Sequence, residues 1–133
     1  MKFSIVDSEK TNNFTDPTIQ TKIMSLWENN GLIIGKVLKE GLTVACVYHD
    51  YQTNYKGDYT VSLCQEDMTN GVFDTSKYQW QAYKVDINDK LGVINTWQKI
   101  WSDEENHKIN RVYDFDFEQY KPNGEISIVV AIF

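Results

Sequence analysis

One order of predicted secondary structure occurs twice in the chain, and this repetition limits the available folds more than any other feature. The first half begins with an apolar strand segment, Lys2–Val6. A helix follows, because Asp16-Pro17 is typical of a helix start and apolar residues continue at helical spacing to the stop signal at Gly31. Two further strand segments are predicted at Leu42–Tyr51 and Tyr59–Gln65.

The second half repeats this order. Strand patterns occur at Tyr78–Ile87, Ile109–Tyr120 and Glu125–Phe133, and one helical pattern, Leu91–Trp101, follows the first of them. Both halves therefore read as strand, helix, strand, strand. The additional apolar stretch Leu32–Leu38 is expected to continue the path between the first helix and the hairpin that follows it.

Some residues of the two halves also align when the sequence is shifted by 65 positions, for example Val47-Tyr48 with Val112-Tyr113. We interpret the chain as a single domain, residues 1–133, with pseudo-repeats at about 1–70 and 75–133. The predicted fold class is α+β: duplicated βαββ units form one curved antiparallel sheet, with the helices on one face because each must bury its apolar stripe. A ligand cleft is expected at the junction of the halves.

Composition narrows the classes of partner. The net charge of -6 and pI near 4.8 oppose the phosphate backbone, so direct nucleic-acid binding is not expected. No apolar run reaches the roughly 20 residues that span a bilayer. The segment Met1–Asp16 also lacks the blocks of a signal peptide. The sequence therefore predicts a cytoplasmic protein without membrane association.

Cys46 and Cys64 lie in apolar strand segments and lack the close Cys or His spacing of a metal site. Reduced, buried thiols are expected. A disulfide is the alternative, since a hairpin turning near Tyr55 could place the two residues opposite each other. No metal or cofactor is predicted.

The densest group of candidate functional residues is the segment Tyr113–Tyr120. Strand alternation places its aromatic and acidic residues on opposite faces: Tyr113, Phe115 and Phe117 against Asp114, Asp116, Glu118 and Tyr120. Alternation alone favours an ordinary half-buried strand with solvated carboxylates. The functional alternative is that Glu118 lies in an aromatic cleft as the counter-charge of a cationic ligand.

Aromatic residues for the walls of such a cleft are abundant, and most of them must belong to the core. The candidates are Tyr48, Tyr51, Tyr59, Trp80, Tyr83, Trp97, Trp101 and Tyr120. Trp97 and Trp101 are one helical turn apart, a spacing that more often serves packing of a helix on a sheet. The residues selected as ligand-binding are Glu118, Tyr48, Trp97, Tyr120, Tyr83 and Trp80.

Signatures of catalysis are scarce. There is no Gly-rich phosphate loop and no Gly-flanked nucleophilic serine, and His49 and His107 are the only histidines. Because neighbouring strand residues point to opposite faces, His49 and Asp50 are expected to be a solvated pair rather than an acid-base or metal site. No catalytic residue is assigned.

Several of these segments together resemble the GyrI-like effector-binding superfamily. In the second half the resemblance rests on Trp97–Trp101, Tyr113 and the run Asp116–Tyr120. In the first half it rests on Val47–Asp50 and the Gly-Asp turn with its strand, Gly57–Val61. That superfamily includes ligand-sensing domains of AraC-type and MerR-type multidrug regulators, gyrase-inhibitor relatives and integron-cassette proteins that bind cationic drugs.

The resemblance implies a duplicated βαββ fold and transfers the ligand-countering glutamate of the superfamily to Glu118, with Tyr48, Trp97 and Tyr120 as aromatic companions. Because Met1 opens directly into the first strand, no helix-turn-helix domain is expected, and regulation would need a partner. The predicted function is a freestanding binding domain for hydrophobic, often cationic compounds. The alternatives are a hydrolase of reactive cyclopropane-type compounds that uses Glu118, and a protein-interaction module that inhibits gyrase.

Overall fold

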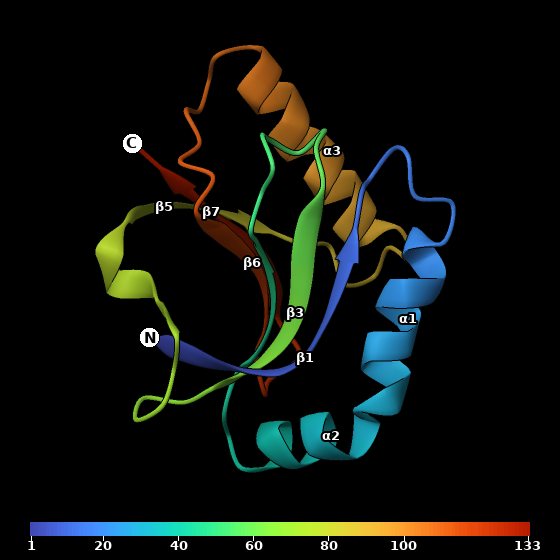
Figure 1. Cartoon of the computed structure of the whole chain (residues 1–133). Helices are drawn as coiled ribbons and strands as arrows, with labels where there is room; N and C mark the ends of the chain where they lie inside the picture. The colour runs from blue at the N-terminus through green and yellow to red at the C-terminus, as the bar shows by residue number, and fades with distance from the viewer.

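A seven-stranded sheet organises the fold, with the strand order β4-β1-β3-β2-β6-β7-β5 and every pair antiparallel (Figure 1). The computed structural model describes residues 1–133. Its elements in chain order are β1 (Lys2–Thr11), α1 (Ile19–Asn29), α2 (Gly31–Lys39), β2 (Val44–His49), β3 (Tyr59–Glu66), β4 (Phe73–Asp74), a 3₁₀ helix (Thr75–Lys77), β5 (Gln79–Lys84), α3 (Gly92–Glu105), β6 (Phe115–Tyr120) and β7 (Ile126–Ile132). No helix has the length and apolar character needed to cross a bilayer.

The predicted α+β class with one curved antiparallel sheet is confirmed. A change of register between Ile5 and Asp7 interrupts the pairing of β1 with β3. Such a bulge bends a strand and increases its twist, so it contributes to the curvature visible in Figure 1. The element order is β1-α1-α2-β2-β3 and then, after β4, β5-α3-β6-β7.

The first half contains a second helix, α2, where the sequence predicted only a connecting path. Asn30 separates α1 from α2, and its side-chain amide donates to the carbonyl of Leu26 and to the carboxylate of Asp7, at 2.8 and 2.9 Å. The predicted start signal of α1 lies just before the helix. Asp16 accepts the backbone N–H of Thr18 at 2.9 Å and pairs with Lys22 at 2.7 Å.

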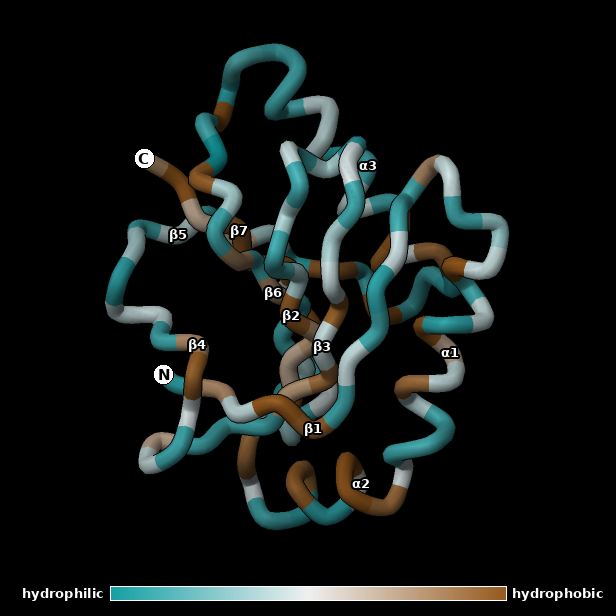
Figure 2. Tube along the Cα trace, viewed as in Figure 1, coloured by the Kyte–Doolittle hydropathy of each residue, from teal (hydrophilic) through white to brown (hydrophobic).

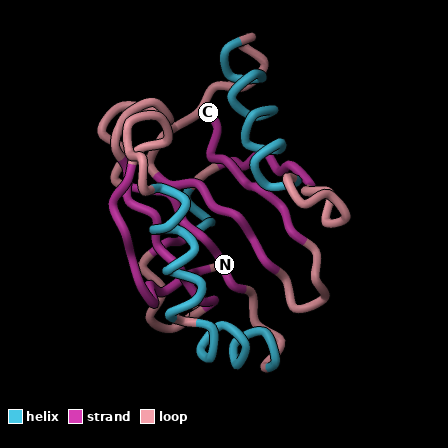
Figure 3. The backbone as a smooth tube through the Cα atoms, turned by 90° about the vertical axis from the view of Figure 1, so that its right-hand side faces the viewer, coloured by secondary structure: helices cyan, strands magenta, loops and turns pink.

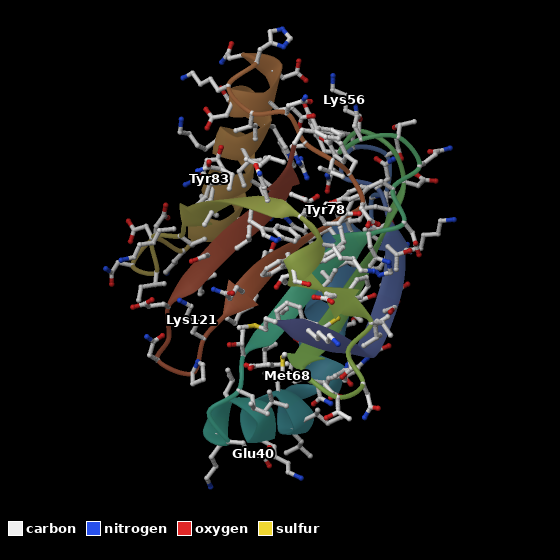
Figure 4. All side chains as sticks on the ribbon, turned by 90° about the vertical axis from the view of Figure 1, so that its left-hand side faces the viewer. Glu40, Lys56, Met68, Tyr78, Tyr83 and Lys121 are labelled. Atoms are coloured by element: carbon white, nitrogen blue, oxygen red, sulfur yellow. The ribbon has the colours of Figure 1, made fainter.

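The helices lie on one face of the sheet, as Figure 3 shows. Val44, Cys46 and Tyr48 of β2 point to this face, where they pack with residues of α1, α2 and α3. The opposite face carries Ala45 and Val47. Aromatic residues cover it, namely Phe3, Phe73, Tyr78, Trp80, Phe115 and Phe117. Figure 2 shows apolar segments in several strands and in α2, and Figure 4 shows Tyr78 on the face without helices.

The two cysteines lie on opposite faces, so the disulfide alternative is wrong. Cys46 is paired with Leu63 across the β2–β3 ladder, whereas Cys64 is paired with Ala45. Residues paired across an antiparallel ladder share a face and neighbours along a strand do not. Both thiols are free and buried, in separate parts of the core.

The strand predicted at Ile109–Tyr120 is shorter than expected, since β6 begins only at Phe115. Tyr113 has a φ of 62°, a left-handed conformation that breaks the alternation just before the strand. The predicted faces of Tyr113 and Asp114 are therefore wrong. Tyr113 contacts Tyr51 and Arg111 on the acidic side, and Asp114 accepts a hydrogen bond from Tyr78 on the opposite face.

The 65-residue shift carries β3 onto residues 124–131, which overlap most of β7, but it does not superpose β2 on β6. It carries β2 onto residues 109–114, immediately before β6. A longer offset relates the residues of the helix face, because Tyr48 and Glu118 are 70 positions apart and point to the same side of adjacent strands. Trp27 and Trp97 are separated by the same number of positions.

Candidate functional site

A cavity of about 600 Å³ opens on the helix face of the sheet. Its lining includes residues of α1, α3 and the central strands β2, β3 and β6, and 14 of its 19 lining residues are hydrophobic. Figure 3 shows α1 and α3 on the same face of the sheet, over different parts of it. Gly92 allows α3 to begin close to the preceding loop, because a Cβ at this position would lie 2.3 Å from the carbonyl oxygen of Asp86.

The carboxylate of Glu118 lies on the sheet wall of this cavity and is 4% exposed. Three neutral groups donate hydrogen bonds to it. Tyr48 Oη and Trp97 Nε1 donate to Oε2 at 2.6 and 2.7 Å, and Tyr120 Oη donates to Oε1 at 2.6 Å. The donors come from β2, α3 and β6, so the packing of three elements fixes the carboxylate.

The two phenols remain protonated donors over the physiological pH range. Burial, followed by the negative charge of Glu118, raises the pKa of Tyr48 well above its usual value. The same two causes, in the same order, raise the pKa of Tyr120. Hydrogen bonds from neutral donors stabilise the charged carboxylate without cancelling its charge.

A second buried charge lies beside the cavity, but this one is compensated. Arg111 lines the cavity, and its Nη2 donates to Asp116 at 2.7 Å, with both side chains almost fully buried. Asp116 also accepts the phenol of Tyr51 at 2.6 Å and the backbone N–H of Ala131 at 2.8 Å. Glu118, in contrast, belongs to no ion pair.

The acidic face of β6 is therefore covered by helices rather than solvated as alternation alone would favour. Asp116 is 0% exposed and Glu118 is 4% exposed. Four of the selected residues meet in the cavity: Tyr48, Trp97, Glu118 and Tyr120. Tyr51, Tyr59 and Trp101 from the wider group of aromatic candidates also line it.

Two selected residues do not reach this cavity, and their selection is corrected. Trp80 lies on the opposite face, where its indole donates to the carbonyl of Thr75 at 2.6 Å and its ring packs on Phe115 and Phe117. Tyr83 lies on the helix side of β5, but its phenol donates to Asp103 of α3 at 2.8 Å (Figure 4). Trp80 misses the cavity because it points to the other face. Tyr83 misses it because β5 is the outermost strand, beyond β7.

Sequence reasoning missed Arg111 and the wall formed by α1. Arg111 is the only arginine of the chain and stands a few positions before the acidic strand, a signal that could have suggested a buried ion pair. From α1, Ile23, Met24 and Trp27 line the cavity. The Trp27 ring packs edge-on against Tyr120 with centroids 4.7 Å apart.

The expected solvated pair of His49 and Asp50 is solvated only on one side, because the Asp50 side chain is 75% exposed whereas the imidazole is largely buried in the sheet. The His49 side chain is 12% exposed, and its Nδ1 lies 3.3 Å from Asp50 Oδ2. Asp50 follows the end of β2 with a φ of 51°, which returns its carboxylate towards the imidazole. The other ring nitrogen lies 2.6 Å from the hydroxyl of Ser62, so the histidine is held within the sheet.

Comparison with solved structures gives a match over almost the entire chain. An integron cassette protein from the mobile metagenome of Vibrio cholerae has the same fold, with a TM-score of 0.67 and 20% sequence identity over 98% of this chain and 94% of that one. No protein-family model and no curated protein matches the sequence. At this identity the likeness establishes the fold.

Proposed function

We propose that the cavity binds hydrophobic, cationic small molecules and that the protein is a ligand-binding domain of the GyrI-like type. The observation that carries the proposal is the carboxylate of Glu118, which is buried in an aromatic cavity without a cationic partner. A buried charge is costly unless something compensates it. A cationic ligand would supply the missing charge.

The surroundings of Glu118 suit such a ligand. Aromatic faces attract a cation by roughly 2 kcal/mol when water is excluded. Tyr48 and Trp97 form one edge-to-face pair, and Trp27 and Tyr120 form another, both within the cavity lining. The volume of about 600 Å³ falls within the usual range of small-molecule sites. An aromatic cation therefore fits in size and in charge.

Binding is better supported than the alternative of hydrolysis. Both oxygens of Glu118 already accept hydrogen bonds from tyrosine or tryptophan, which leaves little room for a water to be activated. No histidine, serine or cysteine lines the cavity. A histidine base and a serine or cysteine nucleophile are therefore missing from this site.

Isothermal titration with a planar cationic dye and a neutral dye of similar shape tests the proposal. In Glu118→Gln we expect affinity for the cationic dye to fall about tenfold or more, because the buried counter-charge is lost. Affinity for the neutral dye should not fall. Glu125→Gln is the matched control, since Glu125 is an exposed carboxylate paired with Lys121. Equal affinity of wild type and Glu118→Gln for the cationic dye would refute the proposal.

A further inference from the structure

Two buried N–H groups on residues of this cavity have no hydrogen-bond acceptor. They are Nε1 of Trp101 and Nε of Arg111, and no other fully buried side-chain nitrogen or oxygen lacks a partner. An unsatisfied buried donor costs about 1 to 3 kcal/mol. Two such donors at one cavity therefore call for an explanation from its function.

The rings packed against Trp101 are aromatic. Tyr55 stacks on it with ring centroids 5.0 Å apart and an interplanar angle of 9°, and Phe14 packs at 5.8 Å. Two other tryptophans do find acceptors, because Trp97 donates to Glu118 and Trp80 donates to Thr75. Among the tryptophans, only Trp101 has a buried indole N–H without an acceptor.

The two other nitrogens of Arg111 have acceptors. Nη2 donates to Asp116 at 2.7 Å, while Nη1 donates to the Tyr113 hydroxyl at 3.1 Å and to Glu104 at 3.4 Å. The guanidinium lies over the Tyr113 ring, 4.3 Å from its centroid. The carboxylate of Asp116 thus compensates the charge of the guanidinium. The remaining donor, Nε–H, suits a neutral acceptor.

Both N–H groups are shielded from solvent by their neighbours. We propose that the ligand carries a neutral carbonyl oxygen in addition to its cationic centre, and that its entry moves these neighbours so that the oxygen accepts hydrogen bonds from Trp101 Nε1–H and Arg111 Nε–H. The inference rests on the proposed function, because Glu118 holds the cationic end. Trp97 and Trp101 are one turn apart on α3, which corresponds to roughly 6 Å along the helix axis. The preferred ligands are therefore aromatic ammonium compounds with a carbonyl group a few bonds from the cation.

A matched pair of ligands tests this specificity. One is an aryl ketone that carries a trimethylammonium group, and the other is the same molecule with a methylene in place of the carbonyl. By isothermal titration we expect the ketone to bind wild type about three- to tenfold more tightly, the effect of satisfying buried donors. Trp101→Phe removes the indole N–H and keeps an aromatic ring. In that variant both ligands should bind more weakly, because the indole lines the cavity, and the preference for the ketone should diminish.

Two variants serve as controls. Trp27 also lines the cavity, but its indole N–H is not a buried group without a partner. Trp27→Phe should therefore weaken both ligands by the same factor and keep the preference for the ketone. Glu118→Gln should likewise weaken both ligands, because both carry the cation, and keep their ratio.

Nuclear magnetic resonance supplies a readout independent of affinity. The chain has 4 tryptophans and therefore gives four indole N–H signals, which single Trp→Phe variants assign. The ketone should move the Trp101 signal and the Arg111 Nε–H signal downfield, and the methylene compound should not. If both ligands bind wild type equally and neither signal responds to the carbonyl, this inference is wrong and the proposed function stands. If neither ligand binds wild type, the proposed function and this inference are both wrong.

Discussion

The phenol of Tyr48 and the carboxylate of Glu118 are 2.6 Å apart, although the two residues are 70 positions apart in the sequence. They lie on β2 and β6, the adjacent central strands that join the two halves of the sheet. The cavity and the connection between the halves therefore depend on the same contact. Substitutions at this contact should affect stability as well as binding.

Tyr48→Phe should lower the free energy of unfolding by about 1.5 to 3 kcal/mol, because it removes a hydrogen bond to a buried charge. Urea unfolding at neutral pH measures the change. Tyr78→Phe is the control, since its phenol donates to Asp114 at the surface, and it should cost about 1 kcal/mol or less. In a Glu118→Gln background the cost of Tyr48→Phe should diminish. An equal cost in both backgrounds would show that the two residues are not coupled.

Asp116→Asn should destabilise the protein by about 3 to 5 kcal/mol, because it leaves the guanidinium of Arg111 buried without its counter-charge. The double variant Arg111→Met, Asp116→Leu removes both charges and should be less destabilised than Asp116→Asn. Lys121→Met breaks an exposed pair with Glu125 and should cost about 1 kcal/mol or less in the same urea experiment. A double variant less stable than Asp116→Asn would contradict this account.

Stability should decrease as the pH falls below about 6.5, in part because of His49. Burial lowers the pKa of His49 from 6.5, and the nearby carboxylates of Asp50 and Asp114 oppose this shift only partly. Below that pH the unfolded chain binds a proton that the folded chain excludes, so the free energy of unfolding falls. The difference between urea midpoints near pH 5.5 and pH 7.5 should be smaller in His49→Gln. A variant with the wild-type difference would rule out this contribution.

Neither cysteine should react with a thiol reagent in the folded protein. Burial raises the pKa of the Cys64 thiol to about 12 and, as the largest cause, raises that of Cys46 as well. Both thiols should react once urea unfolds the chain. A colorimetric thiol assay measures both states. Mild oxidation should produce no intramolecular disulfide, because the side chains lie on opposite faces of the sheet. One rapidly reacting thiol in native buffer would contradict the prediction.

The alternation of polar and apolar residues was enough to predict much of the fold. It placed Phe115 and Phe117 opposite Asp116 and Glu118, and the structure agrees because β6 is regular over these positions. It could not predict the left-handed turn at Tyr113, since nothing in an aromatic residue favours a positive φ. The error in the assignment of Tyr113 and Asp114 follows from that one residue.

The candidate site was predictable only in part for a related reason. A strand pattern tells which residues share a face, but not whether helices cover that face. Glu118 and Tyr48 could be selected from their segments, whereas Trp80 was selected for its residue type and lies on the other face. Arg111 lies before β6 and pairs with Ile132 of β7 by an isolated bridge. Its burial with Asp116 depends on this path of the chain, which a linear pattern does not describe.

The division of the cavity between elements separates recognition of shape from recognition of charge. The donors that hold Glu118 come from β2, β6 and α3, whereas α1 contributes an apolar wall that includes Ile19, Ile23 and Met24. Met24 is 58% exposed, so this wall can accept substitutions without disturbing the core. Descendants of this chain could therefore acquire new ligands through changes in one surface helix while Glu118 and its three hydrogen-bond donors stay unchanged.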